Sequence, residues 1–106
     1  MTAGDQSIPA SAQAFIRRLT QDPRIVRLVL FGSRAVGDHD SRADIDLALS
    51  APELTRREFV RLRREAFEAR SLYWISLVHL EQTPHDLRVR IAEQGVTLYE
   101  RKEAER

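Results

Sequence analysis

The chain of 106 residues contains no cysteine, which excludes disulfide bonds and thiolate metal sites. It has no apolar run long enough to cross a bilayer, so we expect no membrane association. Its N-terminus lacks the basic and apolar regions of a signal peptide, and a cytoplasmic location is therefore expected. The net charge of +1 gives no global reason to expect binding to nucleic acid or to a membrane surface.

The composition that remains is that of an ordinary globular protein, with 42% hydrophobic and 31% charged residues. The length fits one domain, which we expect to span residues 1–106 with flexible tails at 1–7 and 101–106. Neither an internal repeat nor a linker is evident. A domain of this size can bury one hydrophobic core without disulfide support.

Hydrophobic periodicity predicts alternating helices and strands. A capping box at Thr55 and Glu58, with a hydrophobic staple between Leu54 and Phe59, starts the best-defined helix. The order predicts an α/β (α+β) fold, in which a short mixed β-sheet is flanked by helices. The expected helices cover 9–20, 56–70 and 84–94, and the expected strands cover 25–31, 44–50, 72–80 and 96–99.

Several individual positions are also predicted. Thr83 should cap the last helix, with Pro84 in its first turn and Gly95 at its end. Inward-facing positions should form a buried stripe on each of the last two helices. These positions are Phe59, Leu62, Ala66 and Phe67 in one helix, and Leu87, Ile91 and either Val89 or Ala92 in the other.

A glycine-serine turn follows the first apolar strand, in the segment Leu30-Phe31-Gly32-Ser33-Arg34. Gly32 allows a backbone to approach a ligand closely. Backbone N–H groups after Gly32 and the Ser33 hydroxyl can hold phosphate oxygens, and Arg34 could add a charge-assisted contact. This turn is a candidate phosphate site.

Two aspartates lie on one face of the next strand, because Asp44, Asp46, Ala48 and Ser50 alternate with apolar residues. Carboxylates this close repel each other unless a cation lies between them. Mg²⁺ commonly binds one or two carboxylates together with substrate phosphates. Asp44 and Asp46 are therefore candidate metal ligands and catalytic residues. Taken singly, either motif could be a plain turn or a solvated strand face.

The combined pattern, Gly32-Ser33 followed by Ala43-Asp44-Ile45-Asp46-Leu47, resembles the DNA polymerase β-like nucleotidyltransferase superfamily, and most closely its minimal nucleotidyltransferase (MNT) domains. The resemblance covers residues 25–99. It implies ATP as nucleotide substrate, Mg²⁺, and transfer of a nucleotidyl group to a hydroxyl. It also implies an antitoxin role, in which the protein pairs with a HEPN ribonuclease toxin and silences it by adding AMP to a tyrosine.

One position departs from the family pattern, since Ser76 stands where the family has a third carboxylate that holds metal and acts as base. Three readings stay open. The site binds nucleotide but transfers slowly or not at all; Glu81 or His79 substitutes; or the register is shifted by a residue or two. The alternative function is a catalytically degenerate antitoxin that neutralises its partner by complex formation.

Other conspicuous residues have plainer interpretations. His79 is expected to be structural, His39 solvated and His85 on the surface. Tyr73 and Trp74 should lie in the core or an interface, and exposure there would favour a homo- or hetero-oligomer. The basic helix is either a solvated face offset by its own glutamates or a docking surface for an acidic partner or RNA. Its arginines are Arg56, Arg57, Arg61, Arg63 and Arg64.

Overall fold

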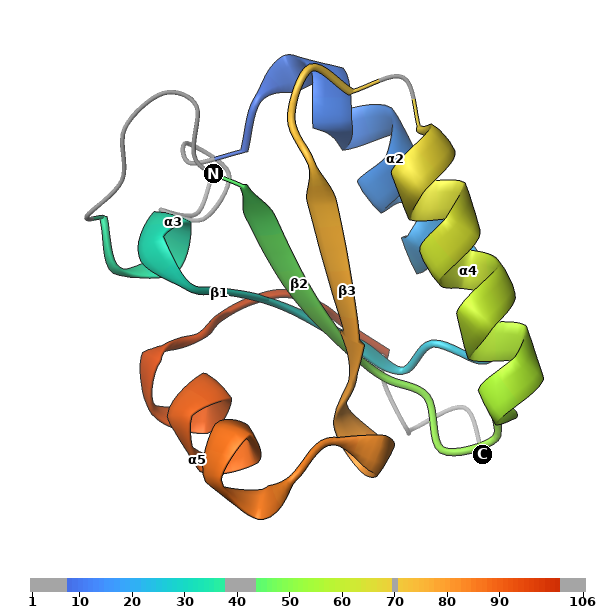
Figure 1. The fold of residues 1–106 in the computed structure, drawn as a ribbon, viewed down its shortest axis with the longest axis vertical. Coiled ribbons are helices and arrows are strands. Elements are labelled where there is room, and N and C mark those ends of the chain that lie inside the picture. Colours follow the sequence, from blue (N-terminus) through green and yellow to red (C-terminus); the bar gives the residue numbers. More distant parts are fainter. Residues whose placement is uncertain (1–7, 38–43, 70, 102–106) are drawn as a thin grey trace.

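A computed structural model describes residues 8–37, 44–69 and 71–101. In this part of the chain a four-stranded sheet has helices on both faces (Figure 1), as the sequence predicts. The predicted tail 1–7, residues 102–106 and His39 lie outside the described residues. The elements are α2 (Ala10–Thr20), β1 (Arg27–Phe31), α3 (Ser33–Val36), β2 (Ile45–Ser50), α4 (Arg56–Glu68), β3 (Ile75–His79), the 3₁₀ turn η1 (Leu80–Gln82), α5 (His85–Gln94) and β4 (Val96–Glu100).

The sheet is mixed and has the strand order β3-β2-β1-β4. β1 is antiparallel to both β2 and β4, whereas β2 is parallel to β3. In these ladders Asp46 of β2 lies opposite Phe31 of β1 and level with Ser76 of β3. The topology therefore brings the end of β1, the start of β2 and the start of β3 to one corner.

The main core lies between one face of the sheet and helices α2 and α4 (Figure 1). Ile45, Leu47 and Leu49 of β2 are fully buried there, as their alternation predicts. α5 covers the opposite face of the sheet, where it buries Ala48 against Ile91. The predicted open polar face of β2 is thus covered at its middle, and it stays accessible at the aspartate end.

α4 confirms its predicted start but differs from the prediction at its end. The Thr55 hydroxyl accepts a hydrogen bond from the Glu58 N–H (3.1 Å), and the Glu58 carboxylate accepts one from the Thr55 N–H (2.9 Å). Phe59 is buried as expected. The prediction that Phe67 is buried is wrong, because its side chain is 65% exposed beyond the reach of the core.

α5 also differs from the prediction at its first turn. Pro84 occupies the N-cap position, and the Thr83 hydroxyl donates to the His79 carbonyl (2.7 Å) instead of capping the helix. Gly95 ends the helix, although its backbone is extended. A side chain at Gly95 would collide with Val29, so close packing on β1 explains this glycine.

The inward positions of α5 are only partly as predicted. Ile91 is buried and Leu87 packs against the small core, whereas Val89 and Ala92 are both exposed. The third strand is shorter than predicted, because it begins at Ile75 and leaves Leu72 85% exposed. No helix of the described residues is both long and apolar enough to cross a membrane.

Candidate functional site

The glycine-serine turn and the aspartate strand meet directly. Gly32 has a positive φ of 76°, a conformation that favours glycine, and it leads from β1 into the short helix α3. A side chain at Gly32 would collide with the Asp46 carboxylate. Only glycine at position 32 therefore lets the turn pass this close to the Asp46 carboxylate.

α3 was not predicted, because four residues are too few to show a helical period. Its first turn is closed by the Gly32 carbonyl, which accepts hydrogen bonds from the N–H groups of Ala35 (3.1 Å) and Val36 (3.4 Å). The Ser33 N–H lies at the start of this helix, where no intrahelical acceptor exists for it. A phosphate oxygen is a suitable acceptor at such a position.

The Asp46 carboxylate is half-buried and has no hydrogen-bond or ion-pair partner among the described residues. Burial, together with the nearby charge of Asp44, raises the pKa of Asp46 above its ordinary value. Asp44 lies just before β2 and is exposed. Two carboxylates that repel each other, and that have no cationic partner in the described part of the chain, form a donor set that suits a divalent cation.

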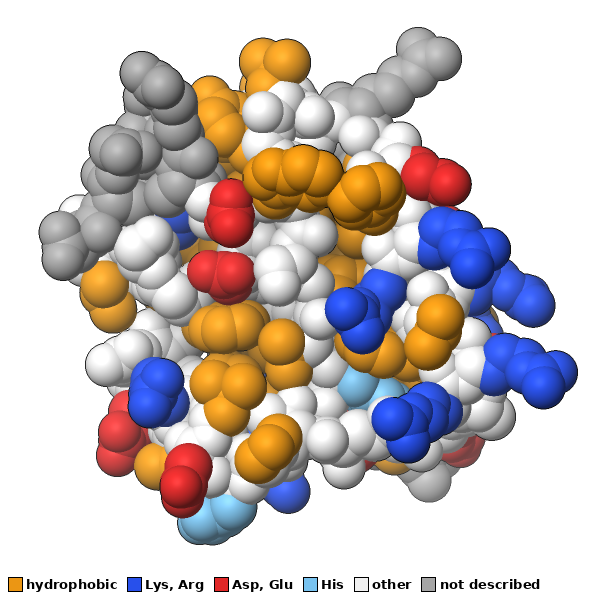
Figure 2. All heavy atoms as spheres, in the orientation of Figure 1, with side chains coloured by type: hydrophobic (Ala, Val, Ile, Leu, Met, Phe, Trp, Pro, Cys, Tyr) orange, Lys and Arg blue, Asp and Glu red, His pale blue; other side chains and the backbone are white. Residues whose placement is uncertain are grey.

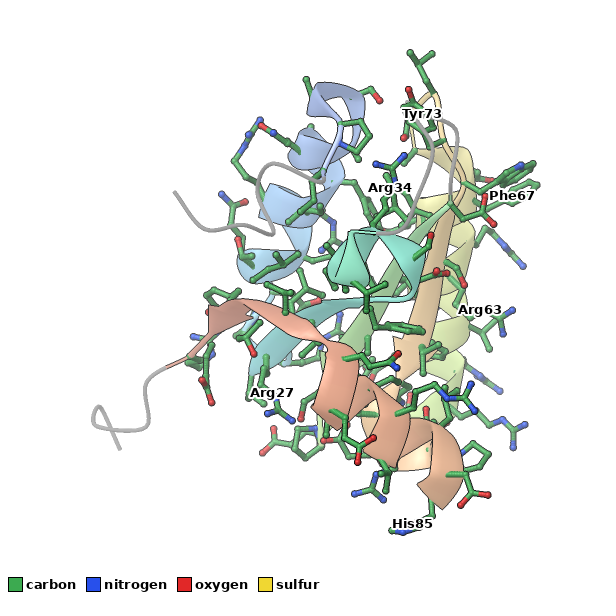
Figure 3. The ribbon with its side chains drawn as sticks, turned by 90° about the vertical axis from the view of Figure 1, so that its left-hand side faces the viewer. Arg27, Arg34, Arg63, Phe67, Tyr73 and His85 are labelled. Carbon is green, nitrogen blue, oxygen red and sulfur yellow. The ribbon has the colours of Figure 1, made fainter. Side chains whose placement is uncertain are left out.

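Arg34 occupies a different environment from the one that a phosphate ligand would need. Its side chain is 4% exposed, and its guanidinium lies 5.2 Å from the centroid of the Tyr73 ring. Figure 3 shows the two side chains next to each other, from α3 and from the segment before β3. The contact holds α3 against that segment, so Arg34 remains the weaker phosphate candidate.

Ser76 lies level with Asp46 on the neighbouring parallel strand, and its side chain is exposed. Residues level with each other on adjacent strands project from the same face. The structure therefore places Ser76 beside Asp46, in a strand, Ile75–His79, that contains no aspartate or glutamate. Within the described residues, no group of three or more His, Cys, Asp or Glu side chains could hold a metal ion.

Glu81 and His79 cannot replace the missing carboxylate, contrary to one sequence hypothesis. The Glu81 carboxylate accepts hydrogen bonds from the Ser50 hydroxyl (2.6 Å) and the Ala51 N–H (2.9 Å), at the far end of β2 from Asp46. His79 is buried, and its Nε2 is 2.9 Å from the Ala51 carbonyl oxygen. The structural interpretation of His79 is confirmed.

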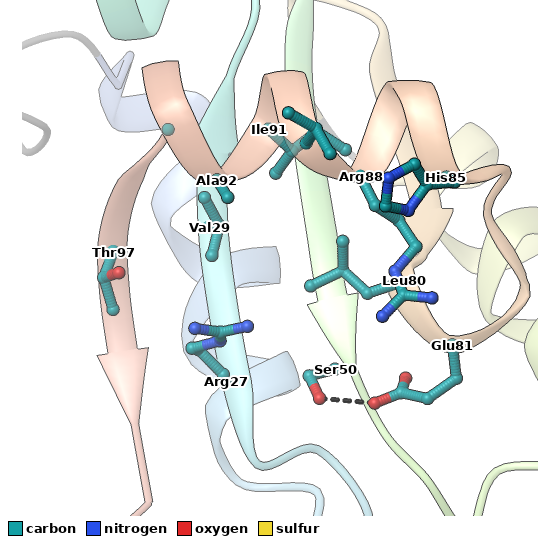
Figure 4. Close-up of a pocket in the computed structure, with 12 residues that line it drawn as sticks. Arg27, Val29, Ser50, Leu80, Glu81, His85, Arg88, Ile91, Ala92 and Thr97 are labelled. Atoms are coloured by element: carbon teal, nitrogen blue, oxygen red, sulfur yellow. Dashed lines mark hydrogen bonds between the residues drawn. The ribbon is translucent and has the colours of Figure 1, made fainter.

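A cavity of about 370 Å³ lies between α5 and the sheet, away from the acid pair (Figure 4). Its walls include Arg27 and Ser50, which lie opposite each other at the other end of β1 and β2 from Phe31 and Asp46. His85 lines this cavity and is exposed, as predicted. The cavity and the aspartates therefore do not form one site.

Comparison with protein families agrees with this geometry. A model of the family described as Polymerase beta, Nucleotidyltransferase matches residues 13–104. The chain belongs to this nucleotidyltransferase family. The resemblance inferred from Gly32-Ser33 and the two aspartates is confirmed, and so is the expected polymerase β-like fold. No significant match occurs among curated proteins.

Solved toxin-antitoxin structures share the fold. A toxin-antitoxin crystal structure with AMP-PNP is 25% identical over 88% of this chain and 76% of that chain, with a TM-score of 0.69. The MNT antitoxin complex with tri-AMPylated HEPN toxin from Shewanella oneidensis is 22% identical over 96% and 76%, with a TM-score of 0.65. A toxin-antitoxin MntA-HepT structure is 19% identical over 97% and 74%, with a TM-score of 0.60.

Proposed function

We propose that this chain is a nucleotidyltransferase-type antitoxin, which transfers AMP from ATP to a hydroxyl of a partner HEPN toxin in the cytoplasm. One observation carries the proposal: the Asp46 carboxylate, which has no hydrogen-bond or ion-pair partner among the described residues, lies against Gly32 in the glycine-serine turn. The family membership and the similarity to toxin-antitoxin complexes, one of them containing AMP-PNP, support it.

Each residue has a defined task in this proposal. The Ser33 N–H and hydroxyl bind phosphate oxygens of ATP, and Gly32 keeps the turn close to Asp46. Asp44 and Asp46 would hold Mg²⁺, which when bound neutralises charge on the phosphates. Arg34 positions the turn through its contact with Tyr73.

The reaction is a displacement at the α-phosphorus of ATP. The partner's hydroxyl oxygen forms a bond to this phosphorus while the bond to the β-phosphate oxygen breaks, and pyrophosphate leaves. The hydroxyl proton passes to solvent, because Ser76 is neutral and cannot accept it as a carboxylate would. Transfer is therefore expected to be slow compared with a site that has three carboxylates.

A second function is favoured by Ser76 itself. Without a third carboxylate beside Asp46, the chain would neutralise its partner by binding alone. The two functions differ in whether the partner becomes modified. Both require a protein complex, but only the first requires the acid pair.

The experiment combines the chain, the protein encoded by the neighbouring gene, Mg²⁺ and ATP labelled at the α-phosphate. If the chain is a transferase, the partner becomes labelled, and Asp44→Asn or Asp46→Asn should reduce the rate of labelling by about 100-fold or more. A tight complex without label, unchanged by either substitution, would establish the binding function instead. Glu53→Gln is the matched control, since Glu53 is an exposed carboxylate outside the site.

A further inference from the structure

Two of the three glutamates of α4 form ion pairs with arginines outside this basic helix. Glu58 pairs with Arg24 (3.2 Å), and Glu65 pairs with Arg18 of α2 (3.0 Å). With these two carboxylates paired outside the helix, Glu68 is the remaining acidic residue of α4 beside its five arginines. No ion pair within the described residues involves the five arginines of α4, which are Arg56, Arg57, Arg61, Arg63 and Arg64.

One flank of α4 combines two of these arginines with apolar side chains. Val60, Arg63, Arg64 and Phe67 follow the spacing i, i+3, i+4, i+7, which places them on a single flank of the helix. In Figure 3 Arg63 and Phe67 both lie on the outer side of α4. A groove of about 460 Å³ separates this flank from residues 75–77 of β3.

The floor of this α4–β3 groove is an edge strand, since β3 pairs only with β2 among the described residues. An edge strand offers unpaired backbone groups to another chain. The groove includes Ser76, which lies level with Asp46. A segment lying in the groove would therefore lead directly to the candidate catalytic corner.

Exposed aromatic rings extend the groove at its upper end. Phe67 packs against Trp74 with 4.9 Å between ring centroids, and Trp74 is 59% exposed. Leu72 adds a third exposed apolar side chain nearby, in the same pocket-forming segment as Trp74. Figure 2 shows hydrophobic side chains gathered beside the basic side chains of α4 on this face. Exposed apolar patches with polar rims are typical of protein interfaces.

We propose that the α4–β3 groove docks an acidic segment of the partner protein, and that this segment carries a large apolar side chain. Carboxylates of the segment would pair with Arg63 and Arg64, and its apolar side chain would pack on Phe67 and Trp74. A protein segment fits better than RNA, because the Phe67 and Trp74 rings pack against each other at a tilt of 32° and leave no separate platforms for successive bases. The proposal rests on the proposed function for the identity of the partner.

The test measures the dissociation constant of the complex between the full chain and the neighbouring-gene protein by calorimetry at two salt concentrations. Arg63→Glu with Arg64→Glu should weaken the complex by at least about tenfold and flatten its salt dependence. Trp74→Ala should weaken it as well. The matched control, Arg88→Glu with Arg90→Glu, makes the same charge change at two exposed arginines of α5, outside the groove, and should alter affinity by no more than about twofold.

Thermal unfolding and ATP binding of each variant establish that the fold and the acid pair are intact. Equal weakening by both double variants would overturn the proposal, because it would show only a general charge effect. An unchanged complex in Arg63→Glu with Arg64→Glu, or no complex with the wild-type chain, would also overturn it. So would loss of binding to a 20-nucleotide RNA in that variant while the protein complex stays intact.

Different results would refute the docking proposal and the transferase proposal. If the complex depends on Arg63 and Arg64 but no label is transferred, the transferase proposal fails and the groove stands. If label is transferred at the wild-type level by Arg63→Glu with Arg64→Glu, the groove proposal fails and the transferase function stands.

Discussion

The substitution Ser76→Asp tests the geometry of the site most sharply. Ser76 lies level with Asp46 on the adjacent strand, so the new carboxylate would project beside that of Asp46. Neighbouring strands lie about 4.8 Å apart, which brings the two carboxylates to within roughly 5–6 Å of each other. The nearby Asp44 would add a further repulsive charge.

The size of the effect follows from this spacing. Two unit charges at such a distance repel by about 0.8 kcal/mol in water and by about 3 kcal/mol at the effective dielectric near a protein surface. Because position 76 is exposed, we expect the lower end, about 1 kcal/mol. For a domain of this size such a loss lowers the melting temperature by roughly 4–8 °C in EDTA.

Mg²⁺ should reverse this loss, because the cation neutralises the three carboxylates and binds more tightly than in the wild type. AMP transfer should rise by at least about tenfold, since the new carboxylate can accept the hydroxyl proton. Melting curves in EDTA and in Mg²⁺, with labelling assays, measure both effects; Ser76→Asn is the uncharged control. If Ser76→Asp melts like Ser76→Asn in both conditions, the reasoning is refuted.

Three further predictions follow from single contacts. Gly32→Ala should destabilise the fold by about 1–3 kcal/mol, because the φ of 76° disfavours a side chain and the added carbon would collide with the Asp46 carboxylate. It should also weaken ATP binding. Denaturant unfolding measures the loss of stability, and calorimetry measures the loss of affinity. Asp46→Asn should raise the free energy of unfolding of the metal-free protein at neutral pH, because it removes a carboxylate whose ionisation is unfavourable in the folded state. The gain should be absent below pH of about 4 and should grow as pH rises through the raised pKa of Asp46. Denaturant unfolding across pH that shows no such gain would contradict the burial argument. Thr55→Ala should lower the stability by about 1 kcal/mol through loss of the capping box, and ATP binding should not change.

Much of the site was predictable because its signals are local. The glycine-serine turn and the alternation around Asp44 and Asp46 depend only on neighbouring residues, and so does the capping box at Thr55. The prediction that Ser76 occupies the position of the third carboxylate needed a family resemblance as well. Its place beside Asp46 is a property of the sheet register, which no local pattern gives.

The errors arose where distant segments decide burial. Phe67 fits the apolar stripe of α4, but the helix extends past the core, and the ring packs on Trp74 instead. Ala48 lies on the face of the aspartates and is fully buried because α5 covers it. The hypothesis that Glu81 could serve as base failed because the end of β2 binds this carboxylate through Ser50.

The proposed site requires that Asp44 and Asp46 bind a divalent cation beside a phosphate-binding turn. Calorimetric titration of the chain with ATP, in Mg²⁺ and then in EDTA, tests it most directly. We expect binding in Mg²⁺ that falls by at least about tenfold in EDTA or in Asp46→Asn. ATP binding of equal strength in Mg²⁺, in EDTA and in the variant would show that the two aspartates do not bind the metal of an ATP complex.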